Sequence, residues 1–395
     1  MSGIASPVPV AVVGAGLSGL ALAQAIRRTR IGFVVLEKDL SFSAAGRTVR
    51  VHCQPQLNEM VAACLRPGLF ELFLASQSRP DARHIYLDER LKLVNVDERP
   101  EPEVVLDTRT TRQVLAMGLG RCLVYGAEVS AVRDLGSHAC LDLMSGDRLE
   151  AGLCVLADGA DASGRREFAF APKVRDVGLW SFYGVVDMRE PPDLALPDWL
   201  DEGFVVADDG EVKVAMGRYA PAPSLTMLAR RESDGNITLS PQDYVFWNVI
   251  APSFRFPSDP RLWGRDQRTV VESLSAMTGR FDPWLHRLLA LAGTDSYGFL
   301  PLRTSAQGGS RPESAKTIFI GDAAHPMLPA ALSTRVAFDD ARVLGESLAR
   351  AADGSTPAAA AAAAAEAALR RPGFGHVAAA ERAAGPAFGI PGLTA

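Results

Sequence analysis

Three glycines at fixed spacing mark the first place in this sequence where chemistry can be located. Gly14, Gly16 and Gly19 stand in the run Gly14-Ala-Gly-Leu-Ser-Gly19, between the apolar segment Pro9–Val13 and a stretch of good helix formers. Gly14 permits a tight turn, Gly16 lets backbone N–H groups approach a pyrophosphate, and Gly19 allows a helix to pack closely on a strand. The partial positive charge at the helix N-terminus favours phosphate groups. The pattern therefore predicts a turn that binds a dinucleotide.

An acidic residue follows the second expected strand. Gly32–Leu36 is another short apolar run, and Glu37 closes it eighteen residues after Gly19. A carboxylate at that position accepts hydrogen bonds from both ribose hydroxyl groups, which a phosphorylated ribose would prevent. Lys38 stands beside it, and we include it in the candidate cofactor site.

Two more aspartates follow short apolar runs later in the chain. Asp158-Gly159 lies in the stretch Cys154–Arg165, and Asp322 lies in Ile318–Pro329, which precedes Asp339-Asp-Ala341. Open α/β sheets bind ligands at the carboxyl ends of their strands. Taken singly, Asp-Gly is most often a turn, but the three motifs in this order predict one shared ligand groove.

The segments between the motifs predict the elements that position them. Helices are expected over Leu20–Arg30, Gln267–Thr278 and Pro283–Ala292, and a short buried strand is expected over Thr317–Ile320. The alanine tract Ala358–Ala365 favours a surface helix. Between about 171 and 300 the pattern changes to strand-like runs, which we expect to form an antiparallel sheet: Leu179–Met188, Phe204–Ala207, Val212–Tyr219, Ser224–Arg230 and Tyr244–Ile250, with Asp208–Glu211 as a hairpin turn.

Composition argues against several classes of protein. The net charge is −5 with both signs mixed along the chain, which is not the basic face of a nucleic-acid binder. The five cysteines are scattered and contain no C-x-x-C pair, so we expect buried thiols in a reducing compartment. No run approaches the roughly 18 uninterrupted apolar residues of a membrane span. We therefore expect a cytoplasmic protein.

Signatures of metal, hydrolase and acid–base chemistry are missing from the sequence. It contains no H-x-x-x-H, H-E-x-x-H or clustered Cys/His, so no metal is expected, and no G-x-S-x-G elbow. We interpret His325 as structural, because no second histidine or acid lies nearby in the sequence. The sequence leaves the catalytic residues unknown. Six side chains of the middle region either line a substrate cavity or pack the sheet, and both interpretations stay open: Trp180, Phe182, Tyr183, Met216, Phe246 and Trp247.

Taken together, the three motifs resemble the fingerprint of the class A flavoprotein monooxygenases, the para-hydroxybenzoate hydroxylase-like group. The resemblance runs over roughly Val8–Leu348 and extends to Phe281–Leu289 and Pro301–Arg303. It implies an α/β fold with a doubly wound, Rossmann-like FAD-binding domain and an inserted antiparallel β-sheet that forms a substrate domain. The implied boundaries are 1–170 for the first part of the FAD-binding domain, which can include part of the substrate region around 80–100, 171–300 for the substrate domain, 301–350 for the rest of the FAD-binding domain, and 351–395 for an alanine-rich C-terminal helix or tail.

The resemblance also implies residue roles. Gly14, Gly16, Gly19 and Glu37 would hold the ADP half of FAD. Arg109 matches an arginine near the phosphate and ribitol, and Asp158 and Gly159 match a pair associated with both FAD and the pyridine nucleotide. Asp322 would bind the ribitol, and Pro329 would lie beside the isoalloxazine. Gly46–Arg50 matches an arginine-bearing segment near the pyrophosphate, with Arg47 or Arg50 as the contacting residue.

The function implied is that of an NADPH- or NADH-dependent monooxygenase. The nicotinamide is a transient reductant, dioxygen adds to the flavin, and the resulting C4a-peroxyflavin hydroxylates or epoxidises an aromatic, polyketide- or terpenoid-type metabolite. The cofactor carries this chemistry, while the protein supplies position and a dry environment.

One segment departs from the family pattern. After Pro329 the family has a glycine-rich stretch, whereas this chain has no glycine across Ala330–Val336. Side chains at Leu332 or Thr334 stand where backbone amides would approach the flavin, so we expect a displaced isoalloxazine, weaker flavin binding or a rebuilt loop. Ser333 or Thr334 is expected to cap the following helix. The alternative is a flavin-fold protein that works as a non-redox isomerase or cyclase, or as a non-catalytic binding protein.

Overall fold

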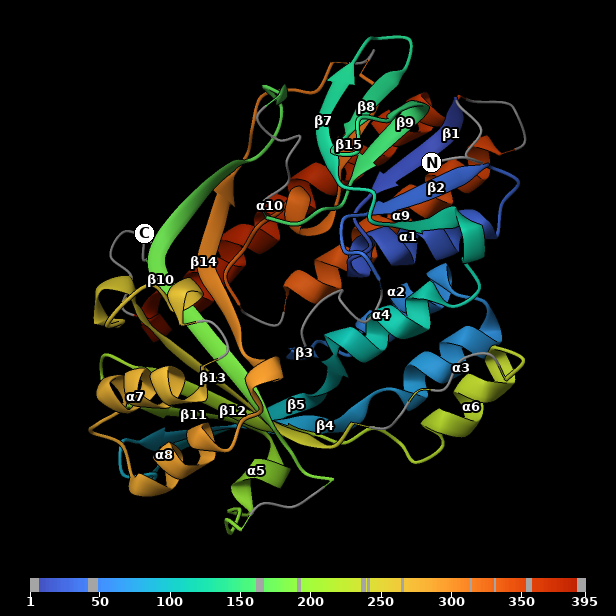
Figure 1. Cartoon of the computed structure of the whole chain (residues 1–395). Helices are drawn as coiled ribbons and strands as arrows, with labels where there is room; N and C mark the ends of the chain where they lie inside the picture. The colour runs from blue at the N-terminus through green and yellow to red at the C-terminus, as the bar shows by residue number, and fades with distance from the viewer. Residues whose placement is uncertain are drawn as a thin grey trace.

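The structure is a computed structural model that describes most of the chain. The described residues are 7–41, 49–160, 167–189, 193–235, 239, 242–263, 266–312, 315–329, 332–352 and 357–388, with the backbone alone for 385–388. Two sheets dominate this part of the chain, and helices lie between them and on their outer faces (Figure 1).

The first sheet is mostly parallel and carries the glycine turn. Within the described residues its strands run in the order β6-β2-β1-β9-β8-β7, and β15 also pairs with β9. The strands are β1 (Val8–Val13), β2 (Phe33–Glu37), β6 (Leu123–Tyr125), β7 (Val129–Asp134), β8 (Ala139–Leu143), β9 (Arg148–Leu156) and β15 (Thr317–Phe319). Because β1 pairs in parallel with β2 and β9, and β15 in parallel with β9, the carboxyl ends of these four strands meet at one edge. That edge is where the three sequence motifs begin.

The second sheet is larger and mostly antiparallel. Its order in the described residues is β14-β10-β13-β12-β11-β4-β5-β3, with a parallel pair between β11 and β4. The strands are β3 (Arg50–Cys53), β4 (Ser78–Asp88), β5 (Leu93–Asp107), β10 (Lys173–Asp187), β11 (Phe204–Asp208), β12 (Lys213–Tyr219), β13 (Tyr244–Pro252) and β14 (Gly298–Ala306). Since β3, β4 and β5 belong to it, the sheet is not confined to the segment 171–300.

Helices fill the space between the sheets and cover the outer face of the large one. In Figure 1, α1, α2 and α4 lie between the sheets, while α7 and α8 pack on the far side of the large sheet. The helices are α1 (Leu17–Arg27), α2 (Leu57–Cys64), α3 (Pro67–Ala75), α4 (Thr108–Ala116), α5 (Trp199–Glu202), α6 (Leu225–Glu232), α7 (Gln267–Met277), α8 (Pro283–Ala290), α9 (Ser333–Ala351) and α10 (Ala358–Phe388). Short 3₁₀ turns are η1 (Gly120–Cys122), η3 (Ser253–Arg255), η4 (Pro260–Leu262), η5 (Thr294–Ser296) and η6 (Gly321–Ala323). Among the described helices, none combines the length and apolar character that crossing a membrane requires.

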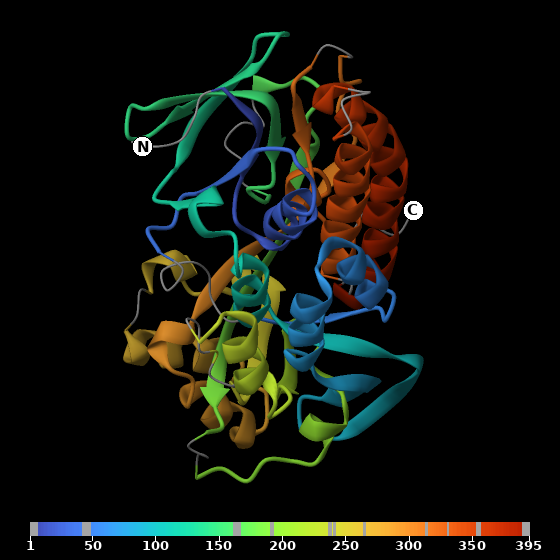
Figure 2. The same ribbon diagram turned by 90° about the vertical axis from the view of Figure 1, so that its right-hand side faces the viewer.

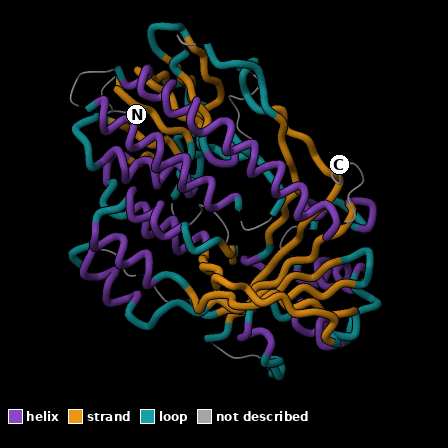
Figure 3. The backbone as a smooth tube through the Cα atoms, turned by 180° about the vertical axis from the view of Figure 1, so that it is seen from behind, coloured by secondary structure: helices purple, strands orange, loops and turns teal. Residues whose placement is uncertain are grey.

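The last described helix joins the two halves of the molecule. α10 runs beside α9 (Figures 2 and 3), and the Ser347 hydroxyl of α9 donates to the Ala361 carbonyl at 2.8 Å. Farther along, Glu381 accepts a hydrogen bond from the Thr304 hydroxyl of β14 at 2.8 Å. The alanines that face inward allow this close packing, and Ala362 is fully buried.

The predicted fold class is confirmed, and so are most of the predicted elements. The Asp208–Glu211 turn joins β11 to β12, which pair as an antiparallel hairpin. One local prediction is wrong. The segment Ser224–Arg230 is not a strand but lies in α6, where Leu225, Leu228 and Ala229 are buried at helical spacing. The alanine tract forms a helix at the surface, with Ala360 and Ala364 exposed and its other side packed on the core.

Candidate functional site

A groove opens at the edge where β1, β2, β9 and β15 end. Its volume is about 460 Å³, within the range of cavities that hold small molecules and parts of cofactors. It brings the three motifs together: the glycine turn, the end of β2, the end of β9 and the turn after β15. The described lining residues are Val13, Gly14, Gly16, Leu17, Ser18, Leu36, Glu37, Lys38, Asp39, Arg112, Ala127, Glu128, Val129, Ala157, Asp158, Gly159, Asp322, Ser333, Thr334 and Ala337.

The glycine turn has the shape that its sequence predicts. Gly14 adopts φ +99°, and a Cβ placed on it would lie 2.7 Å from the Ala157 carbonyl oxygen. A Cβ on Gly19 would lie 2.1 Å from the Gly14 carbonyl oxygen, so this glycine lets α1 approach β1. Gly16 is the N-cap of α1, and no described side chain caps that helix. The first N–H groups of α1 therefore remain for a ligand in the groove.

Glu37 is buried at the end of β2 and is held firmly. Its Oε2 accepts from the Ala15 N–H at 2.8 Å, and its Oε1 accepts from the Asp39 N–H at 3.0 Å. The Arg112 guanidinium lies 3.5 Å from Oε2 and donates through Nε to the Ala15 carbonyl at 2.8 Å. Burial and the nearby Glu37 charge raise the pKa of Asp39. These contacts hold the Glu37 carboxylate in a single orientation at the groove.

The third motif is built on an unusual backbone. Gly321 adopts φ +59°, and a Cβ there would meet the Ser18 hydroxyl oxygen of α1 at 2.0 Å. Its N–H donates to Asp340 Oδ2 at 2.7 Å, which fixes the turn from inside the protein. Burial, reinforced by the charges of Asp339 and Asp322, raises the pKa of Asp340 well above its usual range. Asp322 itself is exposed and lines the groove.

His325 lies directly beneath this turn. Its ring is buried, with Nε2 3.8 Å from Asp340 Oδ2, and it packs edge-on against Phe374 of α10. Burial, with the charges of His376 and Arg370, lowers the pKa of His325 to about 4. The fold thus brings Asp340, fifteen residues later in the chain, next to the His325 ring. Since His325 is buried and is not among the described residues that line the groove, its structural interpretation stands as a prediction.

The segment without glycines leads into α9 and not into a long loop. Ala330 and Ala331 lie outside the described residues, and α9 begins at Ser333. The predicted cap is wrong, because Leu332 is the N-cap and neither hydroxyl caps the helix. Ser333 and Thr334 instead line the groove, and Thr334 hydrogen-bonds the Cys53 thiol. Burial raises the pKa of Cys53 to about 12, so this thiol stays protonated.

The structure brings most of the candidate cofactor residues together. Gly14, Gly16, Glu37, Lys38, Asp158, Gly159 and Asp322 all line the groove. Gly19 lies behind it as a packing residue. Arg47 lies outside the described residues, and Arg50 binds the buried Asp81 of the large sheet at 2.6 Å.

Two of the predicted residues, Arg109 and Pro329, are not among the described residues that line the groove, and their roles toward the ribitol and isoalloxazine stay predictions; Pro329 is exposed. The arginine that faces the groove is Arg112, one helical turn after Arg109 on α4. The Asp107 side chain caps this helix by accepting from the Thr110 N–H at 2.6 Å, which sets the face that each arginine occupies. The sequence indicates a helix over 108–116 that carries both arginines, but only the structure shows that Arg112 is the one that lines the groove.

Several known proteins are similar to this chain in sequence or fold. A family model described as an NAD(P)-binding Rossmann-like domain matches residues 12–66. The dual O-methyltransferase/FAD-dependent monooxygenase CTB3 of Cercospora beticola is 22% identical over 93% of this chain and 45% of its own length. The aurachin C monooxygenase/isomerase of Stigmatella aurantiaca is 25% identical over 81% of this chain and 75% of its own. The crystal structure of CtdE with FAD and a substrate has a TM-score of 0.77 at 18% identity, covering 98% of this chain and 91% of that one.

The chain is thus similar in sequence to FAD-dependent monooxygenases along most of its length, and it shares the fold of a structure solved with FAD. The chain spans less than half the length of two of the relatives that it matches, both of which are named as dual O-methyltransferase/FAD-dependent monooxygenases.

Proposed function

We propose that this chain is an FAD-dependent monooxygenase that hydroxylates or epoxidises an organic metabolite of aromatic, polyketide or terpenoid type. NADH or NADPH would serve as the transient reductant, and dioxygen as the co-substrate. The observation that carries the proposal is the convergence of Glu37, Asp158 and Asp322, from three separate strand ends, on the groove that begins at the Gly14 turn. The monooxygenase names of the relatives support the same reaction class.

The groove fits the adenosine and pyrophosphate half of FAD. A Cβ at Gly14 would collide with the backbone of Ala157, so the tight turn that exposes the start of α1 needs glycine at this position. The first N–H groups of α1 can then bind the phosphates. Glu37 would accept from the ribose hydroxyls, and Arg112, 3.5 Å away, would hold that carboxylate in position. Asp322, exposed at the far wall, would bind the ribitol.

When bound, FAD supplies electron transfer from the nicotinamide and activation of dioxygen. The chain's own contribution is position and exclusion of water. The turn at Gly321 holds Asp322 in place through the hydrogen bond from the Gly321 N–H to Asp340. The non-redox alternative is not favoured, because the relatives that match along most of this chain are named as FAD-dependent monooxygenases.

The first experiment is a spectrum of the purified chain. We expect a yellow protein that loses its flavin absorbance with NADH or NADPH under anaerobic conditions and recovers it with oxygen. A colourless protein that transforms a metabolite without oxygen would contradict the proposal and support the isomerase alternative.

A matched pair of variants tests the groove itself. Asp322→Asn removes a charged acceptor worth about 1.5–3 kcal/mol, so FAD binding should weaken about 10- to 100-fold. Glu59→Gln, an equivalent change on the exposed face of α2, should leave it unchanged. Flavin-fluorescence titration measures both, and equal affinities for the two variants would remove Asp322 from the site.

A further inference from the structure

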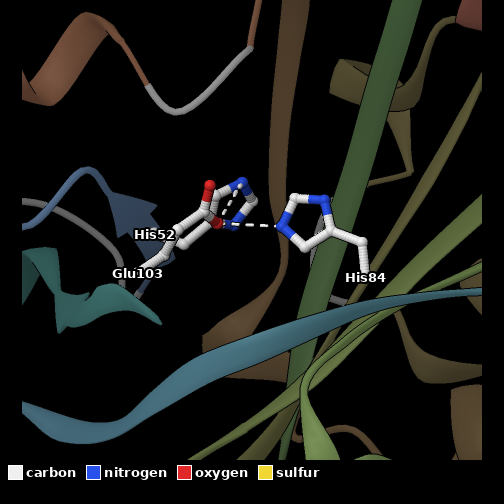
Figure 4. A group of neighbouring side chains, drawn as sticks. All are labelled: His52, His84 and Glu103. Atoms are coloured by element: carbon white, nitrogen blue, oxygen red, sulfur yellow. Dashed lines mark hydrogen bonds and ion pairs between the residues drawn. The ribbon is translucent and has the colours of Figure 1, made fainter. Parts of the chain in front are cut away.

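Three side chains that the cofactor groove does not use gather on the large sheet. His52 comes from β3, His84 from β4 and Glu103 from β5, which are neighbours in the order β4-β5-β3 (Figure 4). The rings of both histidines lie against Phe204, at centroid distances of 4.4 and 5.5 Å. None of the three residues is among the described residues that line the groove. They form a separate polar cluster held by regular β-structure.

The two imidazoles converge on one carboxylate oxygen. His84 Nε2 lies 2.8 Å from Glu103 Oε2, and His52 Nε2 lies 3.9 Å from the same oxygen. All three ligand atoms lie within 4.8 Å of one another. Zinc bonds of about 2.0–2.2 Å in tetrahedral geometry place ligand atoms about 3.3–3.6 Å apart. Changes in the distances between the ligand atoms of up to about 1.5 Å, which side-chain rotations can supply, would therefore bring the three atoms to bonding positions.

The local charges suit a cation. Glu103 Oε2 faces both imidazoles, and imidazole nitrogens and carboxylate oxygens are ligands that zinc takes in proteins. The Arg99 guanidinium binds Glu103 Oε1 at 3.0 Å and leaves Oε2 to the imidazoles.

The buried Arg50 should repel a cation in this cluster only weakly. Its guanidinium is paired with the Asp81 carboxylate through two contacts of 2.6 and 2.8 Å, so the pair is close to neutral. The cluster is also within reach of solvent, since the side chains of His52 and His84 are 18% and 14% exposed. An ion can enter without unfolding of the sheet.

We propose that His52, His84 and Glu103 form a binding site for a divalent transition-metal ion of the zinc type. His52 Nε2, His84 Nε2 and Glu103 Oε2 are the ligands. On binding, the proton between His84 and Glu103 leaves Nε2, either to Nδ1 of the same ring or to solvent. Two imidazoles and one carboxylate satisfy three positions, so at least one remains for water or for an oxygen atom of a small molecule.

The test uses the untagged full-length chain with its flavin and zinc alone as the probe. The protein is first treated with a chelator, then equilibrated with micromolar zinc, separated from free metal by gel filtration, and analysed by inductively coupled plasma mass spectrometry. We expect about one zinc ion per chain. His52→Ala and His84→Ala should each lose it, and isothermal titration should show the corresponding loss of binding heat.

A matched control uses another histidine–carboxylate pair on the other sheet. His138 Nε2 lies 3.8 Å from Glu150 Oε1, a pair with a single carboxylate and no second histidine among its described partners. His138→Ala should keep the full zinc content. Should His84→Ala fail to fold, Glu103→Gln keeps the size of the side chain and removes the charge, and it should also lose the ion.

Two results would overturn the proposal. One is a wild-type chain that retains no zinc after gel filtration. The other is zinc that persists in His84→Ala and Glu103→Gln, or that disappears equally in His138→Ala, which would indicate surface binding. The test does not depend on turnover, so it stands whether or not the chain proves to be a monooxygenase.

Discussion

Replacing Gly14 by alanine separates two reasons for a glycine at the start of the nucleotide turn. Its φ of +99° is a conformation that alanine rarely adopts. In addition, the new Cβ would lie 2.7 Å from the Ala157 carbonyl oxygen and 2.9 Å from the Asp158 Cα. Both atoms are backbone at the end of β9, so they cannot rotate away as a side chain would.

Gly210 provides the control for the first of these reasons. It lies in the β11–β12 turn with φ +92°, and a Cβ there would meet nothing within 4 Å. Gly210→Ala therefore carries only the backbone strain, about 1–3 kcal/mol. Gly14→Ala adds the displacement of packed backbone, about 1–3 kcal/mol more. We expect its total cost to the free energy of unfolding to be about 2–6 kcal/mol.

The assay has two readouts. Urea unfolding of the flavin-free chain measures the stability of each variant, and flavin-fluorescence titration measures the affinity for FAD. Because Gly14 lines the groove and Gly210 is not among its described lining residues, only Gly14→Ala should lose FAD affinity, by about tenfold for each 1.4 kcal/mol of lost binding energy. Equal losses of stability in the two variants, with FAD affinity unchanged in both, would falsify the close-approach argument.

Three further changes have defined outcomes. Arg112→Gln should weaken FAD binding about tenfold, whereas Arg109→Gln should change it little, as measured by fluorescence titration. Since the folded-state pKa of His325 is about 4 and its unfolded value is 6.5, the folded chain binds fewer protons in that interval, and its stability should fall by about 3 kcal/mol as the pH drops from 6.5 to 4. Urea unfolding over this pH range should show a flatter profile in His325→Gln. Leu332→Gly should tighten FAD binding, whereas Thr334→Gly should cost about 1–2 kcal/mol of stability, because Thr334 is buried in α9 and bonds a buried thiol; unchanged FAD affinity in Leu332→Gly would count against the clash that we expect there.

Local sequence was sufficient for the nucleotide-binding edge. The strands β1 and β2 are short β-branched runs, and a parallel sheet buried on both faces needs such runs. Glycine spacing then placed Gly14 and Gly16, and strand ends placed Glu37, Asp158 and Asp322. All these signals lie within a few residues of the group they position.

Features set by distant parts of the chain were not accessible in this way. The parallel pairing of β11 with β4, and the entry of β3 and β5 into the large sheet, depend on contacts between segments far apart in sequence. The cluster of His52, His84 and Glu103 has no sequence spacing that suggests it, because each residue comes from a different strand. The contact between His325 and Asp340 likewise forms only in the folded chain.

One local error also has a physical cause. Ser224–Arg230 alternates in polarity and so resembles a strand, but its apolar residues also match one face of a short helix. For the alanine tract the sequence predicts a helix, but it does not indicate which side is buried, because the tract has no polar and apolar faces to distinguish.

The position of α10 has a consequence for the order of assembly during synthesis. β1, α1 and β2 can form early, but β15, α9 and α10 emerge from a ribosome only after the large sheet has been made. Until then the apolar surfaces that α9 and α10 cover face water, and such surfaces promote aggregation. A nascent form of this chain would therefore expose these apolar surfaces until α10 has docked.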